Sequence, residues 1–396
     1  MEKNMLESNG TGLKKQLSPM SVWALAFGCV IGWGSFINPG KKFLPNSGVA
    51  GTAIAMVLGA LVMIIIAFSY AYLIPKYPKA GGEFTFTRES YGKIPAFICG
   101  WFLVAAYLTN VPMNSTAIPL IVEGLFGKEA LAWGFNYEIA GSSVTLGGIL
   151  IAGFILILFG VLNILGVRKA AIVQTILSSL LIICVFSLFI GALCSPHFSV
   201  EHMNPLWGVN NNTTPWGENE NVAVAILATF AIAPWAFVGF DTIPQASEEF
   251  KFSYKKVIFI MIIAIAFGCF VYVSNNTVTA AVLEDWPEML QENGSRWLLL
   301  EAAGKIMGTP GKILVGTGVS CAVLSGIMGF YLASSRLMYS MSKSGYLPAV
   351  FGKLDKKHGT PKNAMIFCVI ISLAGPVLGR EALGWFVDMS AIGASI

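Results

Sequence analysis

Two short segments of this chain combine glycine or proline with bulky aromatic residues inside apolar stretches. The first is GCVIGWGSFINPG, residues 28–40, and the second is FAIAPWAFVGFD, residues 230–241. Glycine tolerates non-helical backbone angles and proline removes a backbone donor, so a helix can open at both places. The freed N–H groups can then hold a carboxylate, and the freed carbonyls can hold an amine or a cation. The pair suits a zwitterionic ligand, although close packing or a simple kink uses the same residue types.

The composition places these segments in a membrane. Of the 396 residues, 55% are hydrophobic and 12% are charged, and the mean hydropathy is +0.71, whereas a soluble domain carries about a quarter charged residues. The seven cysteines show no paired spacing and the three histidines form no cluster, so we expect neither a disulfide framework nor a metal site. The chain has no phosphate-binding glycine motif and no concentrated basic patch. We therefore expect no enzyme activity, no cofactor and no nucleic-acid partner.

Ten stretches are long and apolar enough to cross a bilayer, which takes about 20 residues. We place them at 21–43, 49–74, 94–122, 144–165, 170–194, 222–247, 256–283, 311–341, 362–379 and 382–396. The tenth has no polar flank, as if the sequence were cut there. The sequence thus predicts an all-α integral membrane protein with the bilayer as its main environment.

The basic residues predict the orientation of these spans. Cytoplasmic loops carry an excess of Lys and Arg, and most of the 25 such residues share one side if the N-terminus is cytoplasmic. The two longest loops of the other side, 195–221 and 284–310, are predominantly acidic. Residues 1–20 are polar and lack a secretory signal, so we expect a cytoplasmic tail there. The plasma or inner membrane is the expected location.

The two segments at which a helix can open, residues 28–40 and 230–241, occupy corresponding places in the two halves of the chain. Division after the fifth span gives a first repeat at 21–194 and a second at 222–396, joined by an outer loop at 195–221. In each half, the span that contains this segment is the first one, and these two spans are predicted to cross the bilayer in opposite directions. Such paired interruptions indicate a transporter built from inverted repeats, with its ligand near the middle of the membrane.

Four motifs, in order along the chain, carry a resemblance to a known family. They are GWGSF at 32–36, PKYPKAGGEFTFTRESYGKIPAF at 75–97, AFVGFD at 236–241 with the acidic pair Glu248 and Glu249 after it, and SSRLMYSMSKSGYLPAVFGKLDKKHGTP at 334–361. Over essentially its whole length the chain resembles the amino acid-polyamine-organocation (APC) permeases. The resemblance implies the LeuT-type fold of five plus five inverted spans, with the substrate between spans 1, 3, 6 and 8.

The resemblance also implies roles for individual residues. Amides around the first break would receive a substrate carboxylate, carbonyls at the second break would meet its amine, and two aromatic rings there would pack on its side chain. The amides are those around Gly32, Trp33, Gly34 and Ser35, the carbonyls are those of Trp235 and Val238, and the rings are those of Trp235 and Phe237. Gly239 is a further expected substrate-binding residue at the second break. Position alone selects Tyr107 and Asn110 in span 3 and Ser320 and Ser325 in span 8, for which helix packing is an equal interpretation.

The chain departs from the family pattern at two points. Trp33 stands where members usually have a small residue, so its indole either faces away from the pocket or makes the pocket smaller. Some proton-coupled members carry a lysine halfway along the fifth span, but residues 173–186 contain no charge. That lysine therefore cannot couple transport to protons in this chain, and a proton, sodium or a counter-substrate remains open as the coupling species.

Ionisable residues inside a span are costly and are candidates for function. Asp241 directly follows the second break, where it would couple transport, form part of a gate, or accept hydrogen bonds from the opened helix. Asp388 lies in the tenth span, at a depth that the sequence does not fix. Glu248 and Glu249 end the sixth span, either as a solvated loop or as an inner gate with Arg88 or Arg336.

Taken together, these features predict a secondary permease for an amino acid or a related amine, working by alternating access. An exchanger of amino acid against amine, or a polyamine or ethanolamine carrier, would use the same architecture. A nutrient sensor is a further alternative, but it would be expected to have a longer soluble tail. A channel would need rings of charge or carbonyls, and none is visible in the sequence.

Overall fold

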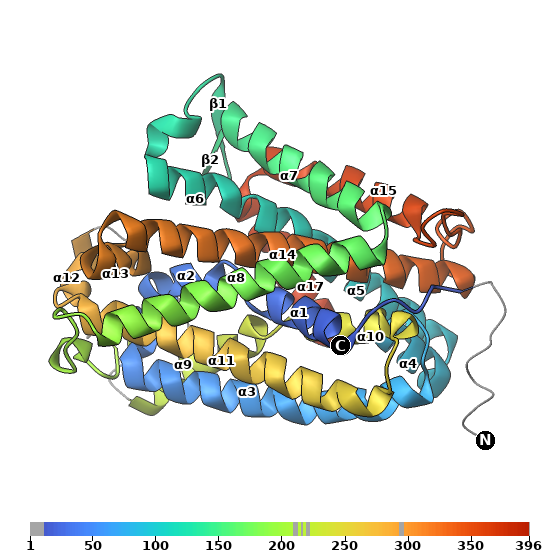
Figure 1. The fold of residues 1–396 in the computed structure, drawn as a ribbon, viewed down its shortest axis with the longest axis horizontal. Coiled ribbons are helices and arrows are strands. Elements are labelled where there is room, and N and C mark those ends of the chain that lie inside the picture. Colours follow the sequence, from blue (N-terminus) through green and yellow to red (C-terminus); the bar gives the residue numbers. More distant parts are fainter. Residues whose placement is uncertain (1–11, 209–212, 215–216, 219–221, 293–296, 396) are drawn as a thin grey trace.

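The computed structural model describes residues 12–208, 213–214, 217–218, 222–292 and 297–395 of the chain. Its long helices run side by side in one bundle (Figure 1). The helices are α1 (Pro19–Val30), α2 (Gly34–Asn38), α3 (Leu44–Lys76), α4 (Gly82–Tyr91), α5 (Lys93–Ser115), α6 (Ala117–Phe126), α7 (Leu146–Ile164), α8 (Val167–Leu193), α9 (Val222–Ala236), α10 (Thr242–Gln245), α11 (Val257–Val282), α12 (Trp286–Glu292), α13 (Leu298–Met307), α14 (Thr309–Lys343), α15 (Lys362–Ser372), α16 (Gly375–Leu378) and α17 (Arg380–Ser395).

Shorter elements complete the described part of the chain. A π-helix at Pro39–Phe43 joins α2 to α3, and 3-10 turns lie at Lys128–Leu131, Glu201–Met203, Ser247–Glu249 and Tyr254–Lys256. Strands β1 (Asn136–Ile139) and β2 (Ser142–Thr145) form an antiparallel hairpin, as do β3 (Thr213–Thr214) and β4 (Gly217–Glu218). The expectation of helices alone is thus corrected by two small hairpins. The predicted outer loop at 284–310 likewise contains α12 and α13.

The helices identify a multi-pass membrane protein. Among the described residues, six helical stretches are long and apolar enough to span a bilayer: Gly34–Lys76, Lys93–Phe126, Leu146–Ile164, Val167–Leu193, Tyr254–Val282 and Thr309–Lys343. Three shorter apolar helices lie at Pro19–Val30, Val222–Ala236 and Lys362–Leu378. The first and sixth predicted spans are shorter because each is interrupted, at the two segments that the sequence singled out.

Local sequence explains where several helices begin. Ser18 caps α1 by accepting a hydrogen bond from the Ser21 amide at 3.2 Å, and Pro19 occupies the first turn, where its missing N–H costs nothing. Thr145 caps α7 in the same way through the Gly148 amide at 3.1 Å. The gap between the first two predicted spans, at 44–48, belongs to α3 and contains a kink. Gly48 forms this kink with a φ of 61°, which other residues rarely reach.

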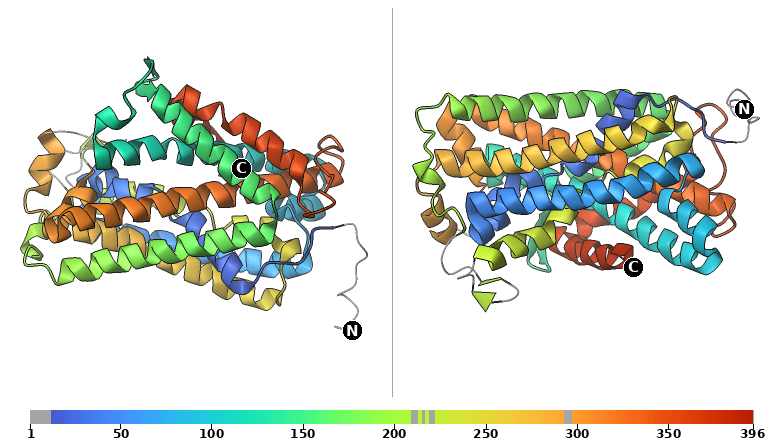
Figure 2. Two further views of the ribbon diagram at one scale, coloured as in Figure 1. Left: turned by 45° about the horizontal axis from the view of Figure 1, so that its top comes forward. Right: turned by 90° about the horizontal axis from the view of Figure 1, so that it is seen from below.

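The interrupted helix α1 lies at the centre of the bundle, against α8, α11 and α14. The Gln174 Nε2 and Ser178 Oγ atoms of α8 both donate to the Ala24 carbonyl, at 3.1 and 2.9 Å. Ser325 Oγ on α14 donates to the Gly28 carbonyl at 3.0 Å. Such side-chain bonds help to hold helices together in lipid, where apolar contact gains little. The hairpin β1–β2 and α7 stand at one edge of the bundle (Figure 2).

Candidate functional site

The first candidate element is the break between α1 and α2. Ile31 has an extended backbone, with φ −96° and ψ 93°, and the helix resumes at Gly34. Ser35 closes the turn, because its amide and its Oγ both bond the Gly32 carbonyl, at 3.2 and 2.9 Å. In the part of the chain that the structure describes, the amides of Gly32 and Trp33 meet no protein acceptor. The Gly34 amide likewise meets none there, so the break offers three open backbone donors, whereas the Ser35 amide is already used.

The second break follows α9 and is wider. Residues 237–241 form a turn between α9 and α10, and Gly239 adopts a φ of 131°. The Trp235 carbonyl accepts the Val238 amide at 3.2 Å, but the Val238 carbonyl has no donor among the described residues. The Gly239 amide donates to Asp241 Oδ1 at 2.7 Å, so this carboxyl stabilises the opened backbone. The Phe237 carbonyl likewise has no donor among the described residues, so free carbonyls of the second break accompany the free amides of the first.

The two breaks are in direct contact. A Cβ atom added to Gly239 would lie 2.5 Å from the carbonyl carbon of Cys29, at the end of α1. A Cβ atom on Gly34 would lie 3.6 Å from Trp235 Cζ3 and 3.1 Å from Asn38 Nδ2. Glycine is therefore required at 239, by its positive φ and by the close approach of α1, whereas at 34 the tightest contact is with Asn38 of the same helix. At Gly32 an added Cβ would meet nothing within 4 Å, so lack of space for a side chain is not the reason for glycine at this position.

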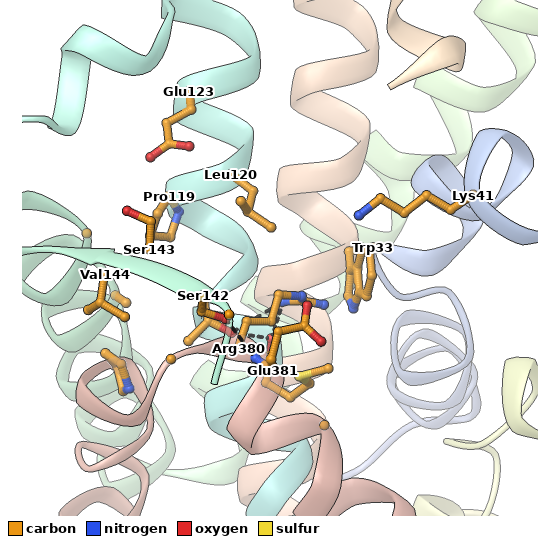
Figure 3. Close-up of a pocket in the computed structure, with 18 of the residues that line it drawn as sticks. Trp33, Lys41, Pro119, Leu120, Glu123, Ser142, Ser143, Val144, Arg380 and Glu381 are labelled. Carbon is orange, nitrogen blue, oxygen red and sulfur yellow. Dashed lines mark hydrogen bonds between the residues drawn. The ribbon is translucent and has the colours of Figure 1, made fainter. Parts of the chain in front are cut away.

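A cavity of about 940 Å³ reaches both breaks. Trp33 and Trp235 line it together with polar residues from α5, α6, the hairpin and α17, and the Trp235 side chain is 39% exposed. Arg380 reaches across toward Trp33 (Figure 3), and its guanidinium carbon lies 3.8 Å above the centre of the indole. Arg380 Nη1 donates to the Met113 carbonyl at 2.8 Å, which fixes the guanidinium plane. The indole of Trp33 therefore forms part of the cavity wall, held in place by stacking.

The other predicted contact residues lie away from this cavity. Phe237 is fully buried against Tyr272 of α11, and Ser325 is fully buried against α1. The side chains of Asn110 and Ser320 bond carbonyls of their own helices, at 2.8 and 2.7 Å. Tyr107 is 1% exposed, and its hydroxyl donates to Asp241 Oδ2 at 2.7 Å. These residues support the walls around the breaks in the conformation described.

Sequence reasoning missed three polar residues near the breaks. Arg380, Gln245 and Glu83 come from α17, α10 and α4, which are far apart in sequence. In the sequence, Arg380 and Glu83 are recognisable only as ionisable residues at the edge of an apolar or glycine-rich stretch. Many surface residues have the same surroundings in the sequence. Asp388 lies on α17, but its side chain is outside the described residues.

The opposite end of the bundle, where α4 and α10 lie (Figure 1), is tightly closed. Arg336 Nε bonds Glu249 Oε1 at 2.7 Å, and the two side chains are only 0% and 2% exposed. The Glu249 carbonyl accepts the amides of Gln16 and Leu17, each at 2.9 Å. Glu248 accepts the amides of Leu13 and Ala80, at 2.8 and 3.2 Å. Of the two arginines considered for this gate, Arg336 is the partner of Glu249.

Comparison with known proteins agrees with this geometry. The family model described as amino acid permease matches residues 17–396. The human "Large neutral amino acids transporter small subunit 2" is 26% identical over 92% of this chain and 64% of its own length. "Branched-chain amino acid permease BcaP" of Bacillus subtilis (strain 168) is also 26% identical, over 98% of this chain and 80% of its own length. A third relative, "Glutamate/serine transporter AimA" of the same organism, is 25% identical over 90% of this chain and 65% of its own length.

These relatives are all amino acid transporters by name, and this chain spans about two thirds of the length of several of them. The match to the family model, residues 17–396, includes both helix breaks, the residues that line the cavity and the closed end. Because the family model matches nearly the whole chain, the chain belongs to the amino acid permease family.

Proposed function

We propose that this protein is a secondary transporter that moves an amino acid or a related amine across the plasma or inner membrane by alternating access. The observation that carries the proposal is the direct contact between two helix breaks at the end of one cavity. The five-plus-five arrangement of inverted repeats, with a cytoplasmic N-terminus, is part of this proposal. It accounts for two interrupted helices that meet although they are far apart in sequence.

The open backbone groups give the ligand its orientation. The amides of Gly32 and Trp33 bind the substrate carboxylate, because they are free donors in a low-dielectric setting. The carbonyl of Val238 accepts from the substrate amine. The exposed ring of Trp235 then lies beside the substrate side chain. A zwitterion would satisfy free donors and free acceptors at once.

The described conformation corresponds to a site that is open to the outside. The cavity lies toward Lys41, Lys42 and the hairpin, which the distribution of charge places outside. The end closed by Arg336 and Glu249 is then cytoplasmic. Transport requires this closure to open as the cavity closes, by rocking of the bundle of spans 1, 2, 6 and 7 against spans 3, 4, 8 and 9.

Uptake into proteoliposomes tests the proposed function. The full chain is reconstituted, and the twenty labelled amino acids and common amines are offered one at a time, with and without unlabelled substrate inside. Uptake into empty vesicles indicates net transport, whereas uptake only into preloaded vesicles indicates an exchanger. Binding of a labelled ligand without any flux would identify a sensor and would overturn the transport proposal.

We expect the Gly34→Val substitution to weaken substrate binding about 10- to 100-fold. An added Cβ is already 3.1 Å from Asn38 Nδ2, and the valine methyl groups extend further into the space near Trp235. Overpacking of this kind costs about 1–3 kcal/mol, and each 1.4 kcal/mol is about tenfold in affinity. The measurement is equilibrium binding of labelled leucine, serine and glutamate to detergent-solubilised protein.

Gly153→Ala is the matched control for this glycine substitution. It lies in α7, where the nearest atom to an added Cβ is Leu373 Cδ2 at an ordinary 3.6 Å. The control should bind like the unmodified protein. Unchanged affinity in Gly34→Val would show that α1 is merely kinked and that its amides do not bind the substrate.

We expect Trp33→Ala to extend the accepted substrates toward larger side chains. The indole forms part of the cavity wall under Arg380, so its removal enlarges the cavity next to the open amides. The measurement is competition of tryptophan, leucine and alanine against uptake of the best labelled substrate. An unchanged order of competition would contradict a role for Trp33 in pocket size, and Trp385→Ala on the exposed surface of α17 is the control.

A further inference from the structure

A chain of hydrogen bonds connects the second helix break to the short helix α4. The Tyr107 hydroxyl bonds Asp241 Oδ2 at 2.7 Å, and Gln245 Nε2 lies 3.4 Å from the same hydroxyl. Gln245 Nε2 also bonds Glu83 Oε2 at 2.5 Å, and Tyr70 donates to Glu83 Oε1 at 2.6 Å. The five side chains come from α3, α4, α5, α10 and the turn after α9. They form one polar network inside an otherwise apolar bundle.

The network contains two carboxyl groups and lacks a balancing cation. The titratable groups that face Glu83 are Tyr70 on α3, Cys99 and Tyr107 on α5, and Asp241 after α9. Among the described residues, neither carboxyl has a basic partner within ion-pair distance. Two negative charges in such surroundings repel each other, and burial penalises each of them. A bound proton or cation would relieve both costs.

A second observation also points to a missing ligand. Gln245 is fully buried, and its Oε1 atom has no hydrogen-bond partner among the described residues. A buried polar atom without a partner costs about 1–3 kcal/mol. A proton on Glu83 turns that carboxyl into a donor, and rotation of the Gln245 amide then lets Oε1 accept from it. Protonation therefore satisfies an acceptor that is otherwise orphaned.

We propose that Glu83 and Asp241 form a proton-binding site that couples substrate movement to protons. This inference rests on the proposed transport function. While the cytoplasmic end is closed, one proton from the outer solution passes by way of the cavity and the second break and forms an O–H bond with a carboxylate oxygen of the pair. The same bond breaks, and the proton leaves to the cytoplasm, once rocking separates α4 from α10. Asp241 senses the substrate because its other oxygen bonds the Gly239 amide at the break.

The surroundings of Glu83 favour the protonated form near neutral pH. Burial, followed by the nearby charge of Asp241, raises the pKa of Glu83 from 4.5 to about 8. The site is therefore loaded below about pH 8 and loses its proton as the pH rises through that value. α4 lies between α3 and α5 at the closed end of the bundle, so Glu83 would reach the cytoplasm only once that end opens. The network thus replaces the missing lysine of the fifth span as the coupling element.

Uptake driven by an imposed pH gradient tests the inference. The full chain in proteoliposomes is offered labelled leucine, serine and glutamate, with the outside more acidic by 1 pH unit, while an internal dye reports proton entry. We expect up to about tenfold accumulation, because one unit corresponds to about 1.4 kcal/mol per proton. In Glu83→Gln the accumulation and the proton signal should be lost, and any remaining uptake should no longer depend on pH. Glu83→Asp should restore part of the pH dependence.

The matched control is Glu89→Gln on the same helix, an exposed residue that pairs with Arg88; it should behave like the unmodified protein. If Glu83→Gln fails to fold, Tyr70→Phe is tested instead. That change removes a bond that favours the charged carboxylate, so the midpoint of the pH dependence should move to higher pH. Uptake that ignores the proton gradient, that requires sodium instead, or that keeps its pH profile in both variants overturns this inference. Absence of any uptake at any pH would instead overturn the proposed function itself.

Discussion

Glu249→Gln is expected to destabilise the protein by about 3–5 kcal/mol, because it leaves a charged guanidinium unpaired in the interior. The Arg336 side chain is 0% exposed, and its Nε bonds Glu249 Oε1 at 2.7 Å. A neutral amide can accept that hydrogen bond but cannot balance the charge. We expect a clear fall in the melting temperature of the solubilised protein. The measurement is size-exclusion chromatography after heating, which gives the fraction that remains folded at each temperature. Because the pair closes one end of the bundle, we also expect that end to open more often in the variant.

Two further variants separate charge pairing from other effects at this position. Glu248→Gln changes the neighbouring carboxyl, which among the described residues accepts backbone amides from Leu13 and Ala80 and pairs with no cation, so its effect should be smaller. The double variant Arg336→Met with Glu249→Leu removes both charges and should recover much of the lost stability. If Glu249→Gln is as stable as the unmodified protein, the pair does not hold the closed end.

Gly239→Ala is expected to abolish transport and to lower stability, because two separate penalties meet at one residue. Its φ of 131° is strained for any residue with a Cβ, at a cost on the order of 1–3 kcal/mol. The new Cβ would also lie 2.5 Å from the Cys29 carbonyl carbon and 2.7 Å from the Val30 nitrogen. These are backbone atoms at the end of α1, so relief requires the two breaks to move apart.

Uptake and thermal stability, measured on the same preparation, show which penalty dominates. Separation of the breaks removes the shared site, so we expect uptake to fall at least tenfold even in protein that remains folded. The control is again Gly153→Ala, for which both uptake and melting temperature should be unchanged. Normal uptake by Gly239→Ala would show that the breaks do not act as one site.

The role of Arg380 illustrates how far the cavity depends on distant parts of the chain. It begins α17, yet its guanidinium stacks on Trp33 near the start of the chain and bonds the Met113 carbonyl of α5. The start of α17 is thereby linked to the break between α1 and α2 at the wall of the cavity (Figure 3). The indole of Trp33 consequently lines the cavity.

The sequence by itself determined the membrane environment, most helix positions and the location of both breaks. These features depend on local composition: apolar runs must become helices in lipid, and glycine, which tolerates non-helical backbone angles, occurs in both of the segments where a helix opens. For this reason the breaks at 31–33 and 237–241 agree with the segments singled out at the start. Family membership was likewise predictable, because its motifs are short and local.

Only the tertiary structure decided which side chains face one another. Gln245 meets Glu83 across 162 residues of sequence, and neither residue has a pattern that reveals the partner. Phe237 and Trp235 are neighbours in the same segment, yet one ring is fully buried and the other is 39% exposed to the cavity. Side-chain direction at an opened helix depends on what packs there from elsewhere in the chain. A single sequence records the residue types, but the contacts between distant segments arise only when those segments pack.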